Sequence, residues 1–173
     1  MAGFRDLAAA ITERLREHFP DTDLAQQQVL CLAEEAGEFV GAYRRWAGMA
    51  RRTGSWEHVK AELADVVVTA YVAANVLGVA DRLDCVHESL AEPAGHDVLR
   101  QVRAVFCAAA DVVAVFDREG PSEALLTTHL VSVVDLACDT ARVLGIDLDE
   151  AVREKTAVVM TRGWRDEPAE VTE

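Results

Sequence analysis

The chain has 173 residues and a formal net charge of −13 at pH 7, with 17 Lys or Arg residues against 30 Asp or Glu residues. This acidic balance argues against duplex DNA, RNA or an anionic membrane as the main partner, and the length suits one domain or a tight tandem with a sizeable core. The four cysteines are widely spaced and form no Cys-x-x-Cys pair, so neither a zinc site nor a disulfide framework is expected.

The amino-acid usage predicts an all-α fold. Ala, Leu, Val, Glu and Arg dominate while Gly and Pro are few, which favours helix throughout the chain. Pro20 ends the first helix, Asp21 or Thr22 is expected to cap the second, and a basic loop over 48–55 precedes the third. The expected helices cover 4–18, about 22–46, 55–78, 81–90, 96–117, 122–145 and 147–164. The Glu-Pro-Ala-Gly segment at 92–95 is the only clear internal boundary.

Nothing at the start of the chain or in its apolar runs predicts export or membrane insertion. Charged residues interrupt the first turns of the sequence, which is not the pattern of a secretory signal. The longest uncharged run, 66–80, has 15 residues and falls short of the roughly 20 that a spanning helix needs. We therefore expect a cytoplasmic protein that contacts no membrane, with 66–80 inside a buried core helix.

The two halves of the chain resemble each other at an offset of 67 residues. Between 62 and 79, eight of 18 positions are identical to those of 129–146, including a Val-Val pair and a Val-Leu-Gly end. The second copy has His129 and Ser132 where the first has Glu62 and Asp65. We interpret this as an internal duplication, which predicts a helical bundle built as a single-chain pseudo-dimer. Unit 1–92 keeps the acidic motif, and unit 93–173 is a degenerate copy that packs on it.

Two acidic clusters on consecutive predicted helices are the main functional signal. Glu34, Glu35 and Glu38 fall within an arc of roughly 100° on one helix, and Glu62 and Asp65 share a face of the next. Carboxylates with no His or Cys in the motif suit Mg²⁺ or Mn²⁺. A solvated charged helix face is the alternative, but apolar residues flank both clusters, which places the acids at the edge of a core, where each needs a cation or a donor.

This Glu-Glu-x-x-Glu…Glu-x-x-Asp pattern resembles the MazG-like, all-α nucleoside triphosphate pyrophosphatases. The resemblance covers about a quarter of the chain, from Leu32 to Gly78, and includes the basic loop between the two motif helices. It implies that Glu35, Glu38, Glu62 and Asp65 bind Mg²⁺, with Mn²⁺ as a substitute. Glu34 would be a fifth ligand or the base that activates water, and Glu34 and Glu35 are the catalytic candidates. The implied activity converts an NTP or dNTP to its monophosphate and pyrophosphate, as in removal of surplus or non-standard nucleotides.

Basic residues in two other segments are candidates for binding the phosphates. Lys155 and Arg162 match the spacing of Lys and Arg in the resembled family, although the Asn common between them is Val159 here. Cations offsetting the dipole at the end of a helix are the alternative interpretation. Arg51 and Arg52 in the basic loop could close over the phosphates or could form a solvated turn.

The residues that would bind the base are the least defined. Asn75 is a polar residue in an apolar helix whose partner could be a nucleobase edge or a backbone carbonyl. Trp46 and Trp56 flank the basic loop, where they could stack on a base or pack at the helix ends, and Tyr71 is a further candidate. A di-iron bundle is set aside because no Glu-x-x-His pair accompanies the acids. The alternative from another class is a non-catalytic helical module that binds a nucleotide or a partner, and the sequence leaves open a homodimer of pseudo-dimers.

Overall fold

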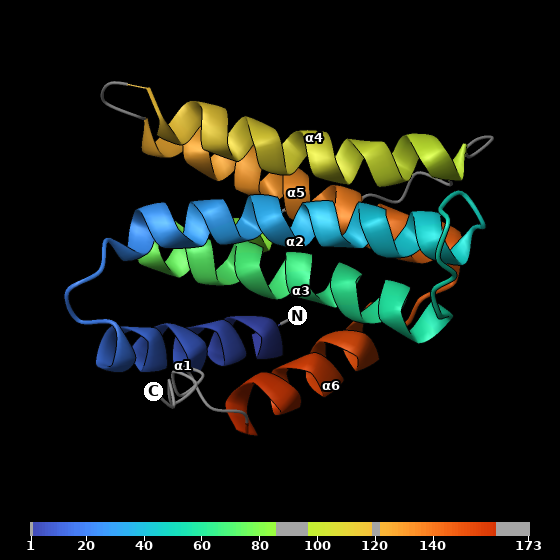
Figure 1. Ribbon diagram of the computed structural model, residues 1–173. Coiled ribbons are helices and arrows are strands. Elements are labelled where there is room, and N and C mark those ends of the chain that lie inside the picture. Colours follow the sequence, from blue (N-terminus) through green and yellow to red (C-terminus); the bar gives the residue numbers. More distant parts are fainter. Residues whose placement is uncertain (1, 86–96, 119–121, 162–173) are drawn as a thin grey trace, which may run out of the picture.

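The computed structural model describes residues 2–85, 97–118 and 122–161, and within these ranges its regular secondary structure is all helix, with no strand. This confirms the predicted all-α fold (Figure 1). The helices are α1 (Ala2–His18), α2 (Leu24–Trp46), α3 (Trp56–Val76), the 3-10 helix η1 (Ala80–Cys85), α4 (Val98–Phe116), α5 (Glu123–Leu144) and α6 (Leu148–Thr161).

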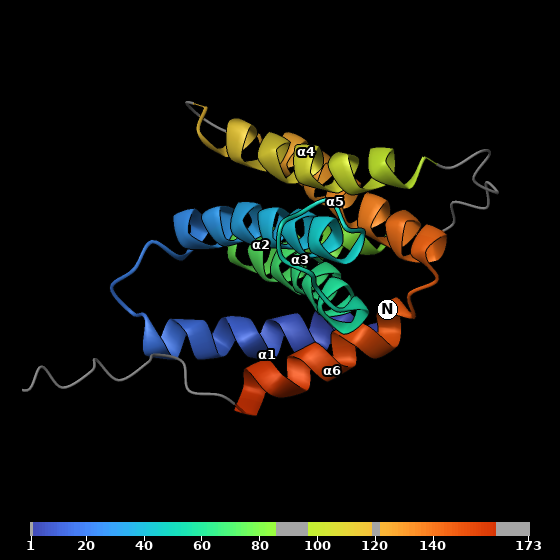
Figure 2. The same ribbon diagram turned by 45° about the vertical axis from the view of Figure 1, so that its right-hand side comes forward.

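The six α-helices form three layers of two (Figures 1 and 2). The α4–α5 pair lies on one side, the antiparallel α2–α3 pair lies in the middle, and α1 and α6 lie on the other side. Helix α3 is the central element, since it packs against α1, α2, α5, α6 and η1. Its apolar run, Val66 to Ala74, is almost wholly buried, as expected for a core helix. The acids of α3 are therefore carried on the most constrained helix of the fold.

Capping residues set where the two motif helices begin. Ser55 caps α3 by accepting a hydrogen bond from the backbone N–H of His58 at 3.1 Å, as predicted. The expected cap of α2 at Asp21 or Thr22 was wrong, because Asp23 caps that helix through the backbone N–H groups of residues 25 and 26. The reason is local: Thr22 donates its backbone N–H to the carbonyl of residue 19, closing a turn that delays the helix.

The ends of α3 and α5 keep the offset of 67 residues. Ser55 and Ser122 occupy the two N-cap positions, and Gly78 and Gly145 follow the two C-terminal ends with φ of 74° and 69°. Only glycine adopts this left-handed conformation without strain. In both places the next residue donates its N–H to the carbonyl five residues earlier, at 2.9 and 2.8 Å. The matching ends are compatible with a duplication, which stays a prediction, and the boundary at 92–95 lies outside the described residues.

Two other expected helices differ from the structure or extend beyond its described part. Over 81–90 we expected a short helix, and the described part is the 3-10 helix Ala80–Cys85. The last helix is described as far as Thr161, short of its expected end at 164. Helix α5 is long and apolar enough to cross a membrane. This is weak evidence for a membrane span, because core helices of soluble proteins pass the same test.

Candidate metal centre

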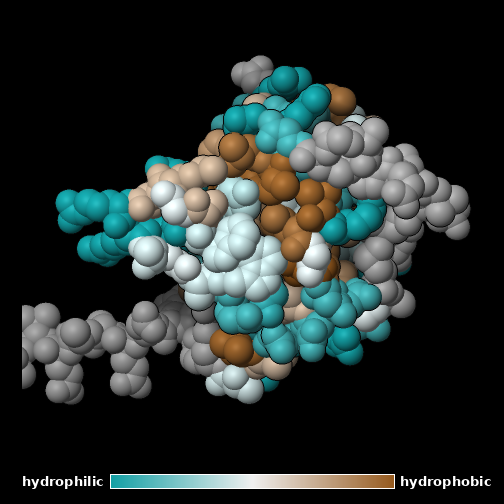
Figure 3. All heavy atoms as spheres, turned by 90° about the vertical axis from the view of Figure 1, so that its right-hand side faces the viewer, coloured by the Kyte–Doolittle hydropathy of each residue, from teal (hydrophilic) through white to brown (hydrophobic). Residues whose placement is uncertain are grey.

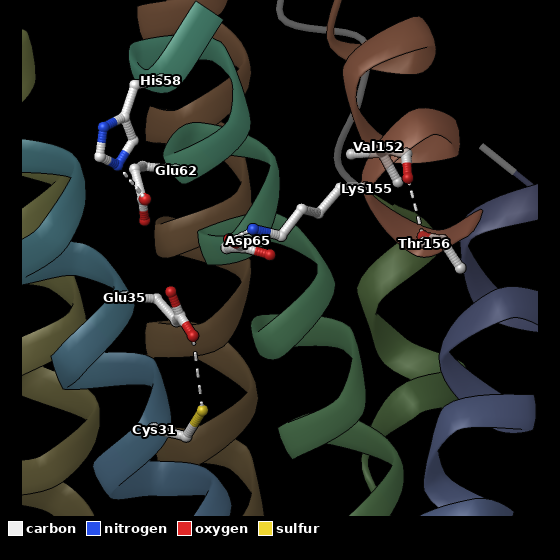
Figure 4. A network of polar contacts seen from close by, with 8 residues as sticks. All are labelled: Cys31, Glu35, His58, Glu62, Asp65, Val152, Lys155 and Thr156. Carbon is white, nitrogen blue, oxygen red and sulfur yellow. Dashed lines mark hydrogen bonds and ion pairs between the residues drawn. The ribbon is translucent and has the colours of Figure 1, made fainter. Parts of the chain in front are cut away.

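Three of the predicted acidic residues converge between α2 and α3. Glu35 comes from α2, while Glu62 and Asp65 lie about one turn apart on α3, and one carboxylate oxygen from each lies within 4.8 Å of the others. Figure 4 shows the carboxylates of Glu35 and Glu62 pointing toward one another from the two helices. Glu62 and Asp65 are only 6% and 8% exposed, and Glu35 is half-buried. Such closely spaced carboxylates repel strongly where water is excluded.

The electrostatic effect of this crowding appears in the pKa values of two of the acids. The pKa of Glu35 is raised from 4.5 to about 7, first by burial and then by the charges of Asp65, Glu38 and Glu62, with Lys155 opposing the rise. The pKa of Glu62 is also raised, mainly by burial, although its hydrogen bond with a histidine counteracts this. Without a bound cation, the fold therefore disfavours the charged form of both carboxyls, first because they are buried and then because other acids lie nearby.

Two basic side chains contact the group, and one oxygen is left over. The Nζ of Lys155, from α6, forms an ion pair with Oδ2 of Asp65 (Figure 4). The Nε2 of His58 lies 2.5 Å from Oε1 of Glu62. The other oxygen of that carboxylate, Oε2 of Glu62, is buried and has no hydrogen-bond partner among the described residues. A buried carboxylate oxygen without a partner is costly, and a divalent cation would satisfy it.

Two of the contacts at this centre were missed from the sequence. His58 precedes Glu62 by four residues, and Cys31 precedes Glu35 by four, with its Sγ at 3.8 Å from Oε1 of Glu35. The i, i+4 spacing places such pairs on one helix face and could have revealed both. The pKa of Cys31 is raised to about 12 by burial and then by the charges of Glu35 and Glu34. The thiol therefore stays protonated at neutral pH and acts as a neutral neighbour.

The other predicted ligands lie at the margin of the centre. Glu38 is exposed and outside the three-carboxylate group, yet it is close enough for its charge to raise the pKa of both Glu35 and Glu62. Glu34 is exposed, and its charge acts on Cys31. The structure thus separates the five acids into a converging set of three and two exposed neighbours.

Among the predicted phosphate-binding cations, Lys155 alone is in contact with the three-carboxylate group in the described part of the chain. It also lines a cavity of about 230 Å³ between α3 and α6, together with Lys60, Glu57 and Glu154. Lys60 forms an ion pair with Glu57, so the two acids of the lining balance its two lysines. Arg51 and Arg52 are exposed in the loop between α2 and α3. Arg162 lies outside the described residues.

The predicted base-binding residues lie away from the three carboxylates. Trp46 is 44% exposed at the end of α2, and its ring centroid lies 4.6 Å from that of Trp56 and 5.8 Å from that of Tyr43. Figure 3 looks onto this end of the bundle, where a strip of apolar surface is bordered by hydrophilic side chains above and below. Asn75 is half-buried near the opposite end of α3, and its Nδ2 has no hydrogen-bond partner among the described residues. Tyr71 is buried with its ring edge-on to that of Phe4 at 6.1 Å.

The donor set fits a hard divalent cation. Glu35, Glu62 and Asp65 supply carboxylate oxygens, the ligands that Mg²⁺ and Mn²⁺ prefer, and the buried Oε2 of Glu62 has no other partner in the described structure. Comparison of the chain with protein-family models, with characterised proteins and with solved structures finds no match. The case for a function therefore depends on the residues of the site.

Proposed function

We propose that the protein is a Mg²⁺-dependent nucleoside triphosphate pyrophosphohydrolase, which converts an NTP or dNTP to its monophosphate and pyrophosphate. The observation that carries the proposal is the convergence of Glu35, Glu62 and Asp65 within 4.8 Å, with a buried carboxylate oxygen of Glu62 that has no hydrogen-bond partner in the described part of the chain. The resemblance of this motif to the MazG-like pyrophosphatases supports the same reaction. Clearing surplus or non-standard nucleotides is the corresponding cellular role.

Each residue has a distinct part in this proposal. Glu35, Glu62 and Asp65 would hold the Mg²⁺, and Glu38, whose charge acts on both glutamates, is the candidate for a fourth ligand. The ion would supply the positive charge that the non-bridging phosphate oxygens need during attack by water. Glu34 precedes the ligand Glu35 in the chain and is exposed, so it is the candidate to accept a proton from the attacking water.

Lys155 would change partners when the site is loaded. In the structure its Nζ neutralises Asp65. A cation bound by Asp65 would take over that neutralisation and leave the ammonium group available to a phosphate. Lys155 lies on the α6 side of α3, so a phosphate bound to it would approach the metal from that side.

The second half of the chain would support the first without a metal site of its own. His129 and Ser132, which occupy the positions of Glu62 and Asp65 at the offset of 67, are half-buried and supply no carboxylate. The single acid within α4, Asp111, is exposed. These residues favour a pseudo-dimer with one active half.

The ion pair of Lys155 with Asp65 also favours a second candidate, a non-catalytic helical module that binds a nucleotide or a partner. In such a module the lysine would replace the metal as a permanent counter-ion. The two candidates differ in whether a divalent cation displaces that ammonium group and whether a nucleotide is then hydrolysed.

The experiment that tests the proposal is pyrophosphate release from a panel of NTPs and dNTPs with Mg²⁺ or Mn²⁺. The wild type should hydrolyse one or a few of them, and Glu62→Gln should abolish this while keeping the shape of the side chain. Glu17→Gln makes the same change at an exposed position of α1 and should leave the rate unchanged. No turnover of any nucleotide by folded, metal-loaded protein would refute the pyrophosphohydrolase and favour the binding module.

A further inference from the structure

The outward side of α4 carries an exposed surface that no part of the proposed function uses. Helix α4 packs against α5 and α2, and its remaining surface presents Leu99 and Phe106, which are 36% and 45% exposed. Around them lie small exposed residues and three exposed charges. We call this set the α4 face: Leu99, Arg100, Arg103, Phe106, Cys107, Ala110, Asp111 and Ala114. Large apolar side chains are left on a helix surface at a cost unless something covers them.

These residues share one side of the helix. At 3.6 residues per turn they fall within an arc of roughly 140°, with Leu99, Phe106 and Ala110 inside about 40° of it. Phe106 also lies over α2, since a methyl group added at Gly37 would meet its ring at 3.9 Å. One side of the Phe106 ring therefore lies over Gly37 of α2, and the rest of the ring is exposed.

We propose that the α4 face binds the same face of a second copy of this chain, with the two α4 helices antiparallel about a two-fold axis near Phe106 and Cys107. An antiparallel pairing about that point sets Leu99 against Ala114 of the other copy, and Phe106 against Cys107. Each large side chain then meets a small one, in both directions, as an isologous interface requires. The face is self-complementary in size.

Two of the three charges of the face are complementary across the same axis. In the same pairing Arg103 lies opposite Ala110 and next to Asp111 of the other copy, so the axis generates two Arg–Asp pairs. Among the described residues, Arg103 forms a long ion pair with Asp97 at 3.8 Å, with both side chains largely exposed. A parallel pairing would instead set like charges side by side.

The charge distribution favours a second copy over an acidic or basic partner of another kind. The whole chain carries −13, so two copies repel one another over most of their surfaces. Within α4 the exposed charges are Arg100, Arg103 and Asp111, so this helix is slightly basic. Two acidic copies can therefore approach each other here with little repulsion.

The first test is the mass of the full chain by light scattering and sedimentation over a range of concentrations. We expect a species of twice 18.8 kDa that dissociates on dilution. Ala110→Arg, which sets an arginine against Arg103 of the other copy, should raise the dissociation constant by at least roughly tenfold. Ala10→Arg makes the same change at an exposed position of α1 and should leave the constant unchanged. A monomer at every concentration would overturn the proposal, and so would a dimer whose dissociation constant is unchanged by Ala110→Arg.

A charge exchange tests the antiparallel pairing independently of any loss of folding. Arg103→Asp and Asp111→Arg should each weaken the dimer by about tenfold, because each sets like charges together, and the two combined should restore it. A double variant no tighter than either single variant would refute the pairing. A short bis-maleimide should also cross-link two copies through Cys107, and Cys107→Ser should prevent this. Protection of Cys107 in a monomer would mean that another segment of the chain covers the face, which would also refute the proposal.

Discussion

Replacing Glu35 with glutamine should stabilise the metal-free protein at neutral and alkaline pH. The carboxyl of Glu35 has a folded-state pKa of about 7, above the 4.5 of an ordinary glutamate, mainly because it is buried. The protonated form is therefore the one that the fold accommodates. Its stabilising contribution is fully present below pH 4.5 and is lost as the pH rises through about 7. Glutamine keeps the shape and the acceptor for Cys31 but never acquires the charge.

The size of the effect follows from the pKa difference. At about 1.4 kcal/mol per pKa unit, a rise from 4.5 to about 7 costs the folded state about 3 kcal/mol at pH 8 relative to pH 4. Because the Glu35 side chain is only half-buried, solvent screening reduces this to about 2 kcal/mol. Glu35→Gln should therefore exceed the wild type in free energy of unfolding by about 2 kcal/mol at pH 8, with no gain below pH 4.5.

Urea unfolding in the presence of EDTA at pH 4, 6, 7 and 8 measures this difference directly. The matched control is Glu17→Gln, an exposed position on α1 where the change should stay within about 0.5 kcal/mol at each pH. If Glu35→Gln is no more stable than the wild type at pH 8, the carboxylates are not in electrostatic conflict, and the argument for a cation among them fails.

Three further predictions concern the core, a helix end and the thiols. Leu63→Ala should lower the free energy of unfolding by about 2–5 kcal/mol in chemical denaturation, because Leu63 is fully buried on the central helix; a loss below 1 kcal/mol would contradict the described core. Gly145→Ala should cost about 1 kcal/mol by thermal unfolding, because Gly145 has a φ of 69° after α5, and an unchanged melting temperature would contradict that conformation. In protein diluted until it is monomeric, a maleimide should modify Cys107 quickly and Cys31 slowly at pH 7.5, because Cys107 is exposed in the single chain and the pKa of Cys31 is raised to about 12; equal rates by peptide mass spectrometry would argue against a buried Cys31.

The helices and their C-terminal ends could be predicted because their signals are local. A glycine after an apolar helix indicates a helix end, and a serine before one indicates a helix start. In the structure Gly145 does follow α5, and Ser55 does precede α3. The start of α2 could not be placed as well, since 21–23 offers three consecutive capping residues. The choice among them is made by the turn that follows Phe19, which a propensity argument does not see.

At the candidate metal centre, helical periodicity accounts for part of the arrangement. It places Glu62 and Asp65 on one face of α3, and the structure has their carboxylates close together there. It does not separate Glu35 from Glu38, because that depends on the rotation of α2 about its own axis against α3. The contact of Lys155 with Asp65 joins residues 90 positions apart through the packing of α6 on α3, and no local pattern encodes it.

The central claim is that Glu35, Glu62 and Asp65 bind a divalent cation, and Mn²⁺ titration of the metal-free protein tests it most directly. Loss of the free-ion electron paramagnetic resonance signal reports binding, and added Mg²⁺ should reverse that loss by competition. The account predicts saturable binding by the wild type and by Glu17→Gln. It predicts affinity at least roughly tenfold weaker in Glu62→Gln, which loses one ionic ligand of three. Equal affinity in Glu62→Gln and the wild type, or no binding by either, would contradict the account.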